Sequence, residues 1–245
     1  MPATLQERVR REAEHGQVIL GQNEANWGWQ SAAGRIRKQR RADFLAEPAA
    51  ALGVRAAVLE VGCGTGTFTA ALAERFENLV SIDVSEVLLV RARERFPRVH
   101  FERRDIHASG FPDAAFDYVA GCSVLHHLDC PLALKEIQRV LKPGGLLRFS
   151  EPNMLNPQIF LQKNWPWLKR RMGDSPDETA FTPGAMRAML QAAGFEHIRV
   201  RPFEFLHPAV PERLIGPVIG FERWLEATPL YLIGGSIRIE ACRAA

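Results

Sequence analysis

Short apolar runs alternate with longer stretches of helical spacing along most of the chain. We predict that the apolar runs form buried strands and that the stretches between them form helices. This succession is typical of parallel strands joined by right-handed crossovers, and so predicts a doubly wound, mostly parallel α/β sheet. The predicted strands are 56–61, 78–84, 100–106, 116–124, 146–152, 197–203 and 236–242, and the predicted helices are 67–76, 86–96, 131–141 and 182–193.

Three segments lie outside this plan: residues 1–50, 153–181 and 204–235. We predict that 1–50 is an N-terminal helical cap on a core domain of residues 51–245, and that the other two are cap insertions. All the tryptophans of the chain lie in these segments. We expect an aromatic-lined cap over a hydrophobic or ring-containing substrate; the alternative is that the aromatic residues pack the cap onto the core or bury a dimer contact. These residues are Trp27, Trp29, Trp165, Trp167, Trp224, Phe160, Phe181, Phe205, Phe221 and Tyr231.

A glycine-rich loop, Gly62-Cys63-Gly64-Thr65-Gly66, follows the first predicted strand. Ligands of open α/β sheets bind at the carboxyl ends of the strands, where this loop is expected to lie. Asp83 ends the next predicted strand, and an acid there can accept hydrogen bonds from both hydroxyls of a ribose. A dinucleotide fingerprint needs glycine at position 67, which is Thr67, and no Lys-Ser/Thr follows the loop as in a P-loop. We therefore expect a nucleoside-containing cofactor of another kind.

Composition narrows the class of protein. The 245 residues are 47% hydrophobic and 24% charged, which is typical of a globular chain. The net charge of +3 is too small to indicate nucleic acid as the partner. We see no secretory signal and no apolar stretch long enough to insert stably into a membrane, and the four scattered cysteines have no metal-ligand spacing. These features favour a cytoplasmic protein with reduced thiols.

The stretches VLEVGCGTG, SIDVS, RRDI, FDYVAGCSVLHHL and RVLKPGG occur in an order and spacing that resemble the class I S-adenosylmethionine-dependent methyltransferases. The resemblance covers about residues 35–152, and is greatest to the small-molecule branch with quinone C-methyltransferases and natural-product O-methyltransferases. It implies a Rossmann-like, seven-stranded methyltransferase domain over 51–245. It also implies S-adenosylmethionine as cofactor, S-adenosylhomocysteine as product, and methylation of a small, apolar or aromatic acceptor at oxygen or carbon.

The same resemblance assigns residues to the cofactor. Glu60 and the backbone of the three glycines would lie beside its methionine part, and Asp83 would bind the ribose. Asp105 would bind the adenine amine, Ile106 would pack on the ring, and the Cys122 carbonyl would face the amino group. The alternative for both aspartates is a strand-end acid that caps the next turn. The predicted cofactor-binding residues are Glu60, Gly62, Gly64, Gly66, Asp83, Asp105, Ile106 and Cys122.

Three residues near the ends of the fourth and fifth predicted strands are candidates for a general base: His127, His126 and Glu151. A histidine titrates near neutral pH, and a base placed beside the acceptor could remove its proton. The alternative is a histidine that packs or caps a helix. Metal-dependent relatives carry an acid where this chain has Cys122-Ser123, so we expect no metal.

Other interpretations stay open. The chain could be a non-catalytic relative that binds the cofactor as a scaffold, or a nicotinamide-dependent oxidoreductase, against which Thr67 counts. Residues 214–235 are apolar and favour a buried cap segment, but contact with a membrane surface is the alternative. The basic cluster at 35–41 is typical of a solvated helix face, or it could bind a carboxylate of cofactor or substrate. A homodimer also stays open.

Overall fold

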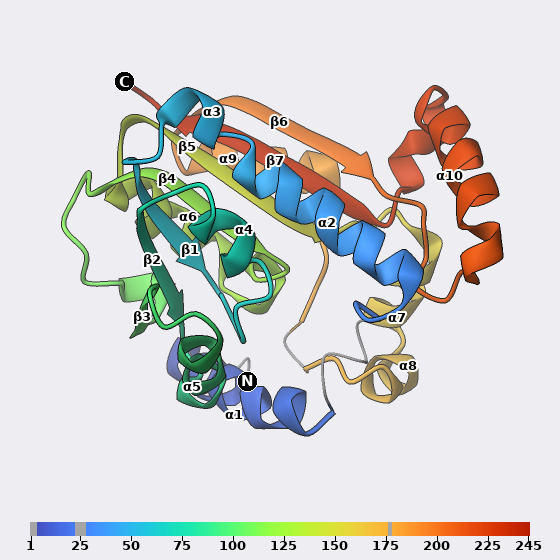
Figure 1. Cartoon of the computed structure of the whole chain (residues 1–245), viewed down its shortest axis with the longest axis horizontal. Helices are drawn as coiled ribbons and strands as arrows, with labels where there is room; N and C mark the ends of the chain where they lie inside the picture. Colours follow the sequence, from blue (N-terminus) through green and yellow to red (C-terminus); the bar gives the residue numbers. More distant parts are fainter. Residues whose placement is uncertain (1–3, 23–27, 176–177) are drawn as a thin grey trace.

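The computed structural model describes residues 4–22, 28–175 and 178–245, and shows one seven-stranded sheet with helices on both faces (Figure 1). The sheet order is β3-β2-β1-β4-β5-β7-β6. All seven predicted strands are present, with bounds shifted by at most five residues. The strands are β1 Ala57–Val61, β2 Asn78–Asp83, β3 His100–Arg103, β4 Phe116–Cys122, β5 Leu141–Pro152, β6 Phe195–Phe203 and β7 Ser236–Arg243.

The first five strands run parallel, and β7 pairs antiparallel with both β5 and β6. Strand β6 therefore points the same way as β1 to β5. The chain order reverses between β1 and β4, which creates the switch point where ligands of such sheets bind. The predicted doubly wound, mostly parallel sheet of seven strands is confirmed.

Helices cover both faces of the sheet because residues of each strand point alternately to either side. Val58 packs with residues of α2 and α4, whereas Leu59 packs with residues of α6 and α9. Helix α5 packs on the β2–β3 side through Leu89. The helices are α1 Leu5–Gln22, α2 Ala32–Ala46, α3 Ala49–Leu52, α4 Thr69–Ala73, α5 Glu86–Arg95, α6 Cys130–Val140, α7 Pro157–Asn164, α8 Pro166–Arg171, α9 Pro183–Ala192 and α10 Glu212–Glu226.

Two strands end earlier than predicted, each for a local reason. Strand β3 stops at Arg103 because Asp105 caps a 3-10 turn, η2, at Ile106–Ala108. Strand β4 stops at Cys122 because Ser123 has a φ of +56°, which a strand cannot hold. A second 3-10 turn, η3, follows at Leu125–His127. Both turns bring polar side chains to the carboxyl edge of the sheet.

The segments outside the predicted core are largely helical. The described residues of the N-terminal segment, 4–22 and 28–52, carry α1, α2 and α3, and the predicted boundary at residue 50 falls within α3. Helix α2 packs on the sheet, where the Tyr118 hydroxyl donates to the Leu45 carbonyl at 2.7 Å. The insertions carry α7, α8, α10 and the 3-10 turn η4 Pro229–Ile233. Of the helices in the described ranges, none combines the length and apolar character that crossing a bilayer requires.

Candidate functional site

The glycine loop leaves β1 at the carboxyl edge of the sheet. Gly62, Gly64 and Gly66 have φ of 68°, 54° and 85°, a left-handed backbone that glycine adopts without strain. A Cβ at Gly64 would meet no heavy atom within 4 Å, whereas a Cβ at Gly62 would lie 2.3 Å from Cγ2 of Val124. The loop is therefore packed at Gly62 and open at Gly64, so a ligand can approach the backbone there.

Asp83 ends β2 directly beside this loop. Its Oδ2 accepts from the Gly64 amide and its Oδ1 from the Ser85 amide, both at 2.9 Å. Burial raises the pKa of Asp83, although these backbone donors oppose the shift. Each carboxylate oxygen has a second lone pair, so Asp83 can still accept hydrogen bonds from ribose hydroxyls. The open backbone at Gly64 and this acid fit the nucleoside cofactor that the sequence predicts.

Glu60 lies one layer below the loop, in the core. It is 3% exposed, and its Oε2 accepts from the Thr69 hydroxyl at 2.6 Å and from the Ser81 hydroxyl at 2.7 Å. Burial raises its pKa to about 7 despite these two donors. These hydrogen bonds connect β1 to α4 and β2, so Glu60 stabilises the packing of these elements beneath the loop. Its predicted place beside the methionine part of the cofactor stays a prediction.

Asp105 begins the 3-10 turn after β3. Its Oδ1 accepts from the His107 amide at 3.0 Å and lies 2.6 Å from His107 Nδ1. Partial burial raises the pKa of Asp105, but the hydrogen bonds from His107 outweigh this effect and lower it overall. Ile106 is buried in the core cluster. Asp105 thus caps a turn, as in the alternative given above, while its role toward adenine stays a prediction.

The end of β4 meets a buried arginine from α2. Cys122 is buried, and Arg41 Nη1 lies 3.9 Å from its sulfur and 3.4 Å from the Ser123 hydroxyl. Arg41 Nη2 donates to Glu204 Oε2 at 2.5 Å and to the Ser236 hydroxyl at 2.7 Å. Of the basic cluster at 35–41, Arg41 is therefore an inward-facing residue rather than part of a solvated face.

Glu204 follows β6 and has a φ of +70°, which is uncommon for a residue with a side chain. Arg37 also contacts its Oε2, at 3.0 Å, and both arginines lie over the ring of Trp29. One carboxylate thus pairs with two arginines, while the Nε of Arg41 and Oε1 of Glu204 are buried without a hydrogen-bond partner. The group has the charge to hold an anion, such as a carboxylate.

His126 of η3 and Glu151, near the end of β5, form a buried pair. Nδ1 of His126 lies 2.6 Å from Glu151 Oε2, and Glu151 Oε1 accepts from the Val124 and Leu125 amides at 2.9 Å each. Burial raises the pKa of Glu151 to about 7 and lowers the pKa of His126 well below its usual value. Glu151 is fully buried against His126, and its predicted role as a base stays a prediction.

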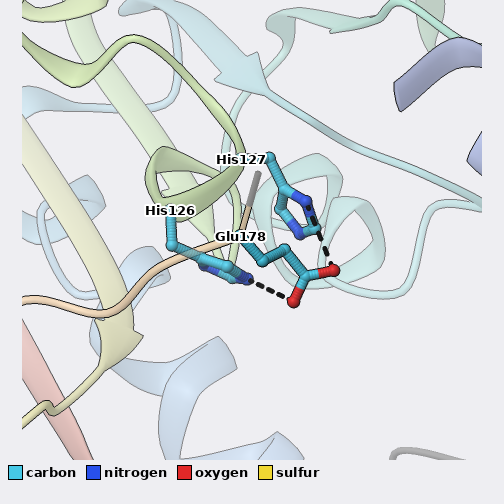
Figure 2. Close-up of side chains that lie close together, drawn as sticks. All are labelled: His126, His127 and Glu178. Atoms are coloured by element: carbon cyan, nitrogen blue, oxygen red, sulfur yellow. Dashed lines mark ion pairs between the residues drawn. The ribbon is translucent and has the colours of Figure 1, made fainter. Parts of the chain in front are cut away.

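His127 is more accessible, with 22% of its side chain exposed. Its Nδ1 lies 3.0 Å from Oε2 of Glu12 on α1. The same atom lies 3.7 Å from Oε1 of Glu178, and Figure 2 shows this pair. Burial lowers the pKa of His127, but these carboxylates outweigh it and raise the pKa overall. Glu12 in turn accepts from the Ser175 hydroxyl at 2.6 Å. With Nδ1 facing Glu12, Nε2 is the nitrogen left to accept a proton.

His126, His127 and Glu178 offer ligand atoms within 4.8 Å of one another, close enough to hold a metal ion (Figure 2). Other groups already contact both oxygens of Glu178, however. The Ser175 amide donates to Oε1 at 2.7 Å, and Lys163 Nζ lies 2.6 Å from Oε2. The ammonium of Lys163 thus already pairs with the carboxylate that a metal ion would share with the two histidines, and the expectation of no metal stays a prediction.

The sequence analysis did not single out Glu12, Glu178 or Glu204. Glu12 lies in a charged helix that reads as solvated, and Glu178 lies in a polar loop, so neither has a local signature. The available signal was the predicted cap itself, because the three tryptophan-bearing segments were expected to lie over the substrate. Each of these segments supplies one of the three acids to the carboxyl edge of the sheet.

The aromatic residues of the cap do not form one lining. Trp29 and Phe181 are buried, whereas the rings on α7, α8 and α10 face outward. Trp27 falls outside the described residues. The expectation of an aromatic-lined pocket therefore does not hold for the residues with more than half of their surface exposed, which are Phe160, Trp165, Trp167, Phe221 and Trp224.

Residues 58–145 match a family described as a methyltransferase domain. The chain is 37% identical to a malonyl-[acyl-carrier protein] O-methyltransferase of Serratia marcescens over 38% of this chain and 37% of that protein. It is 28% identical to a demethylmenaquinone methyltransferase of Staphylococcus haemolyticus over 59% of this chain and 70% of that protein. The chain spans between 37% and 53% of the length of the first curated relatives that it matches.

Solved structures share the fold over most of the chain. A possible histamine N-methyltransferase of Thermotoga maritima superimposes with a TM-score of 0.65 at 19% identity, covering 95% of this chain and 99% of that one. The [4+2]-cyclase SpnF superimposes with a TM-score of 0.55 at 25% identity, covering 84% and 83%. With the glycine loop and Asp83, these findings show that residues 58–145 are a methyltransferase domain, in a chain that has the fold of S-adenosylmethionine-dependent methyltransferases.

Proposed function

We propose that the protein transfers a methyl group from S-adenosylmethionine to a small, apolar or aromatic acceptor at oxygen or carbon. The observation that carries this proposal is the meeting, at one sheet edge, of an open glycine loop with its acid and two carboxylate-supported histidines. When bound, S-adenosylmethionine supplies a methyl group on a positively charged sulfur. The chain then has to hold the acceptor in line and take up its proton.

His127 is the base that we propose. Its Nδ1 faces Glu12, which fixes the ring and leaves Nε2 to accept the acceptor's proton. The carboxylates of Glu12 and Glu178 stabilise the imidazolium that results, as the raised pKa of His127 indicates. His126, held by Glu151 and 5% exposed, supports the turn from below. Glu151 and His126 are therefore positioning residues in this proposal.

The alternative is a cofactor-binding protein that transfers no methyl group. It is kept because SpnF, a [4+2]-cyclase, shares this fold. A nicotinamide-dependent oxidoreductase has no observation in its favour, since Thr67 replaces the glycine that a dinucleotide loop needs.

The test is transfer of labelled methyl groups from S-adenosylmethionine to a panel of phenols, quinols and amines, with mass spectrometry of the products. We expect turnover on an O- or C-acceptor, and a loss of about 10²- to 10⁴-fold in kcat for His127→Ala. In His127→Gln, binding of S-adenosylhomocysteine should persist. Methylation of amines alone would contradict the acceptor class, and unchanged kcat in His127→Ala would contradict the base.

A further inference from the structure

Large apolar side chains are exposed unevenly in the described part of the chain. Sixteen are exposed there, and only four of them, Val54, Val87, Val90 and Leu132, lie outside two cap segments. Monomeric proteins rarely expose contiguous apolar patches of this extent without a partner. The remaining twelve, which we call the cap surface, are Leu155, Phe160, Leu161, Trp165, Trp167, Met172, Leu214, Phe221, Trp224, Leu230, Leu232 and Ile233.

Helix α10 presents apolar residues on its outer side. Its inner side buries Ile215 and Leu225 together with Glu222, which pairs with Arg40 at 2.8 Å. Its outer side carries exposed Phe221 and Trp224, whose rings stack with centroids 5.4 Å apart. Two large aromatic rings stacked on the exposed side of a helix are unusual for a surface that meets only water, so this outer side is suited to a non-aqueous neighbour.

Helices α7 and α8 add positive charge to the exposed aromatic rings. Residues 155–173 contain no Asp or Glu. Arg170 and Arg171 are exposed at the end of α8, and the Arg171 guanidinium lies 5.5 Å from the ring centre of Trp167. Tryptophan beside arginine is the composition found where a protein meets lipid headgroups. The charge of this segment complements an anionic surface.

The two segments are joined by hydrogen bonds. Asn156, at the start of α7, donates to the Ile233 carbonyl of η4 at 2.8 Å, and Asn153 donates to the Leu232 carbonyl at 2.8 Å. Helix α10 leads directly into η4, and Figure 1 shows α7, α8 and α10 along the same side of the molecule. The cap surface is thus continuous at η4.

We propose that the cap surface docks onto anionic lipid bilayers, with its aromatic rings among the headgroups and Arg170 and Arg171 on lipid phosphates. The helices are short, and none is long and apolar enough to cross a bilayer among the described residues, so they would lie on the bilayer surface. A second copy of the chain is the competing occupant. A symmetric contact pairs the same surface of both copies, and residues 155–173 of either copy carry no acid to neutralise Arg170 and Arg171. The docking does not depend on methyl transfer.

The test is co-sedimentation of the full chain with vesicles of phosphatidylcholine, alone or with phosphatidylglycerol. We expect binding to the anionic vesicles that falls with added salt. The double variant Arg170→Gln/Arg171→Gln should bind about 30-fold more weakly, or about fivefold for each arginine. Trp165→Ser/Trp167→Ser should also bind more weakly, and the matched control Val87→Ser/Val90→Ser, on exposed residues of α5, should bind as the wild type does.

Sedimentation velocity without lipid supplies the second readout, and circular dichroism checks that each variant is folded. A monomeric wild type that binds anionic vesicles supports the proposal. The proposal would be overturned if the wild type does not bind vesicles. It would also be overturned if Val87→Ser/Val90→Ser loses as much vesicle binding as Trp165→Ser/Trp167→Ser does. A dimer that Trp165→Ser/Trp167→Ser dissociates, with no vesicle binding, would overturn it in favour of an interface between two copies.

Discussion

The two halves of the carboxyl edge are built in different ways. On the β1–β2 side, the amide of Gly64 meets Asp83 across 19 residues of chain. On the β4–β6 side, Arg41 meets Glu204 and Glu12 meets Ser175, and each pair is 163 residues apart. A local turn fixes the first half, which we call the cradle, and the packing of distant segments fixes the second, which we call the acceptor side. Cofactor binding therefore has a short sequence signature, and the acceptor side does not.

The halves also differ in electrostatics. The cradle uses backbone amides around one carboxylate, whereas the acceptor side uses buried ion pairs. Removing one partner of a buried ion pair leaves an uncompensated charge, which costs far more than losing a surface contact. We therefore expect changes on the acceptor side to affect stability most, and changes in the cradle to affect ligand binding most.

The largest expected effect is in the Arg41–Glu204 pair. Arg41→Met should lower the free energy of unfolding by about 3–5 kcal/mol, because it leaves the 2%-exposed Glu204 paired with Arg37 alone. Adding Glu204→Gln should cost less than the sum of the two single changes. Urea unfolding measures this coupling. The control Arg91→Met removes an exposed i,i+3 ion pair and should lower the free energy of unfolding by about 0.5 kcal/mol or less. If the stability losses of Arg41→Met and Glu204→Gln simply add in the double variant, the expected difference between the two halves would be contradicted.

Glu60 tests whether the cradle also holds a costly buried acid. Its pKa is raised from 4.5 to about 7, so the folded protein binds more protons than the unfolded chain between these values. The stability contributed by Glu60 should thus fall as pH rises through this window, by at most about 3 kcal/mol. Glu60→Gln should gain stability relative to wild type from about pH 4.5 to 7 and then level off. Urea unfolding at several pH values is the measurement, and a difference that stays constant with pH would show that Glu60 is not protonated there.

A comparison of Gly64 with Gly144 distinguishes two effects of adding a side chain in the cradle, which are backbone strain and loss of space for the ligand. Gly64 and Gly144 have φ of 54° and 74°, and a Cβ at either would meet nothing within 4 Å. Alanine at each site should therefore cost a similar strain of about 1–2 kcal/mol. Only Gly64→Ala should also weaken S-adenosylhomocysteine binding, because only Gly64 borders the predicted ligand space. Thermal unfolding measures the stability of both variants, and calorimetry measures their affinity for S-adenosylhomocysteine. If Gly64→Ala and Gly144→Ala bind S-adenosylhomocysteine equally well, the ligand lies elsewhere.

The smallest expected effect is a shift in the titration of His127. Glu12→Gln should lower the pKa of His127, because the carboxylate of Glu12 helps to raise it. The imidazole resonances of His127, followed by NMR as pH is changed, report this pKa directly. His107, which contacts Asp105 rather than Glu12, is the internal reference. If the resonances of His127 titrate identically in both proteins, α1 does not act on the acceptor side.

The sequence predicted the cradle well because its parts are neighbours in the chain. A glycine loop after an apolar strand and an acid after the next strand define a sheet edge by topology alone. The exposed face of α10 could not be predicted, because helical periodicity marks an apolar stripe but not the side that the fold buries. Glu12 and Glu204 gave no signal, since each acquires its role only when a distant segment packs beside it.

The most direct test of the cradle is calorimetric titration with S-adenosylhomocysteine, run beside NAD, on wild type, Asp83→Ala and Asp117→Ala. Asp117 is the matched control, since its Oδ2 also accepts a backbone amide, that of Ala57 at 2.8 Å, but near the start of β4 and away from the loop. We expect binding of S-adenosylhomocysteine by the wild type and by Asp117→Ala, at least about tenfold weaker binding by Asp83→Ala, and no heat with NAD. Wild-type protein that takes up NAD, or that binds S-adenosylhomocysteine no better than Asp83→Ala does, would contradict the assignment of the cradle.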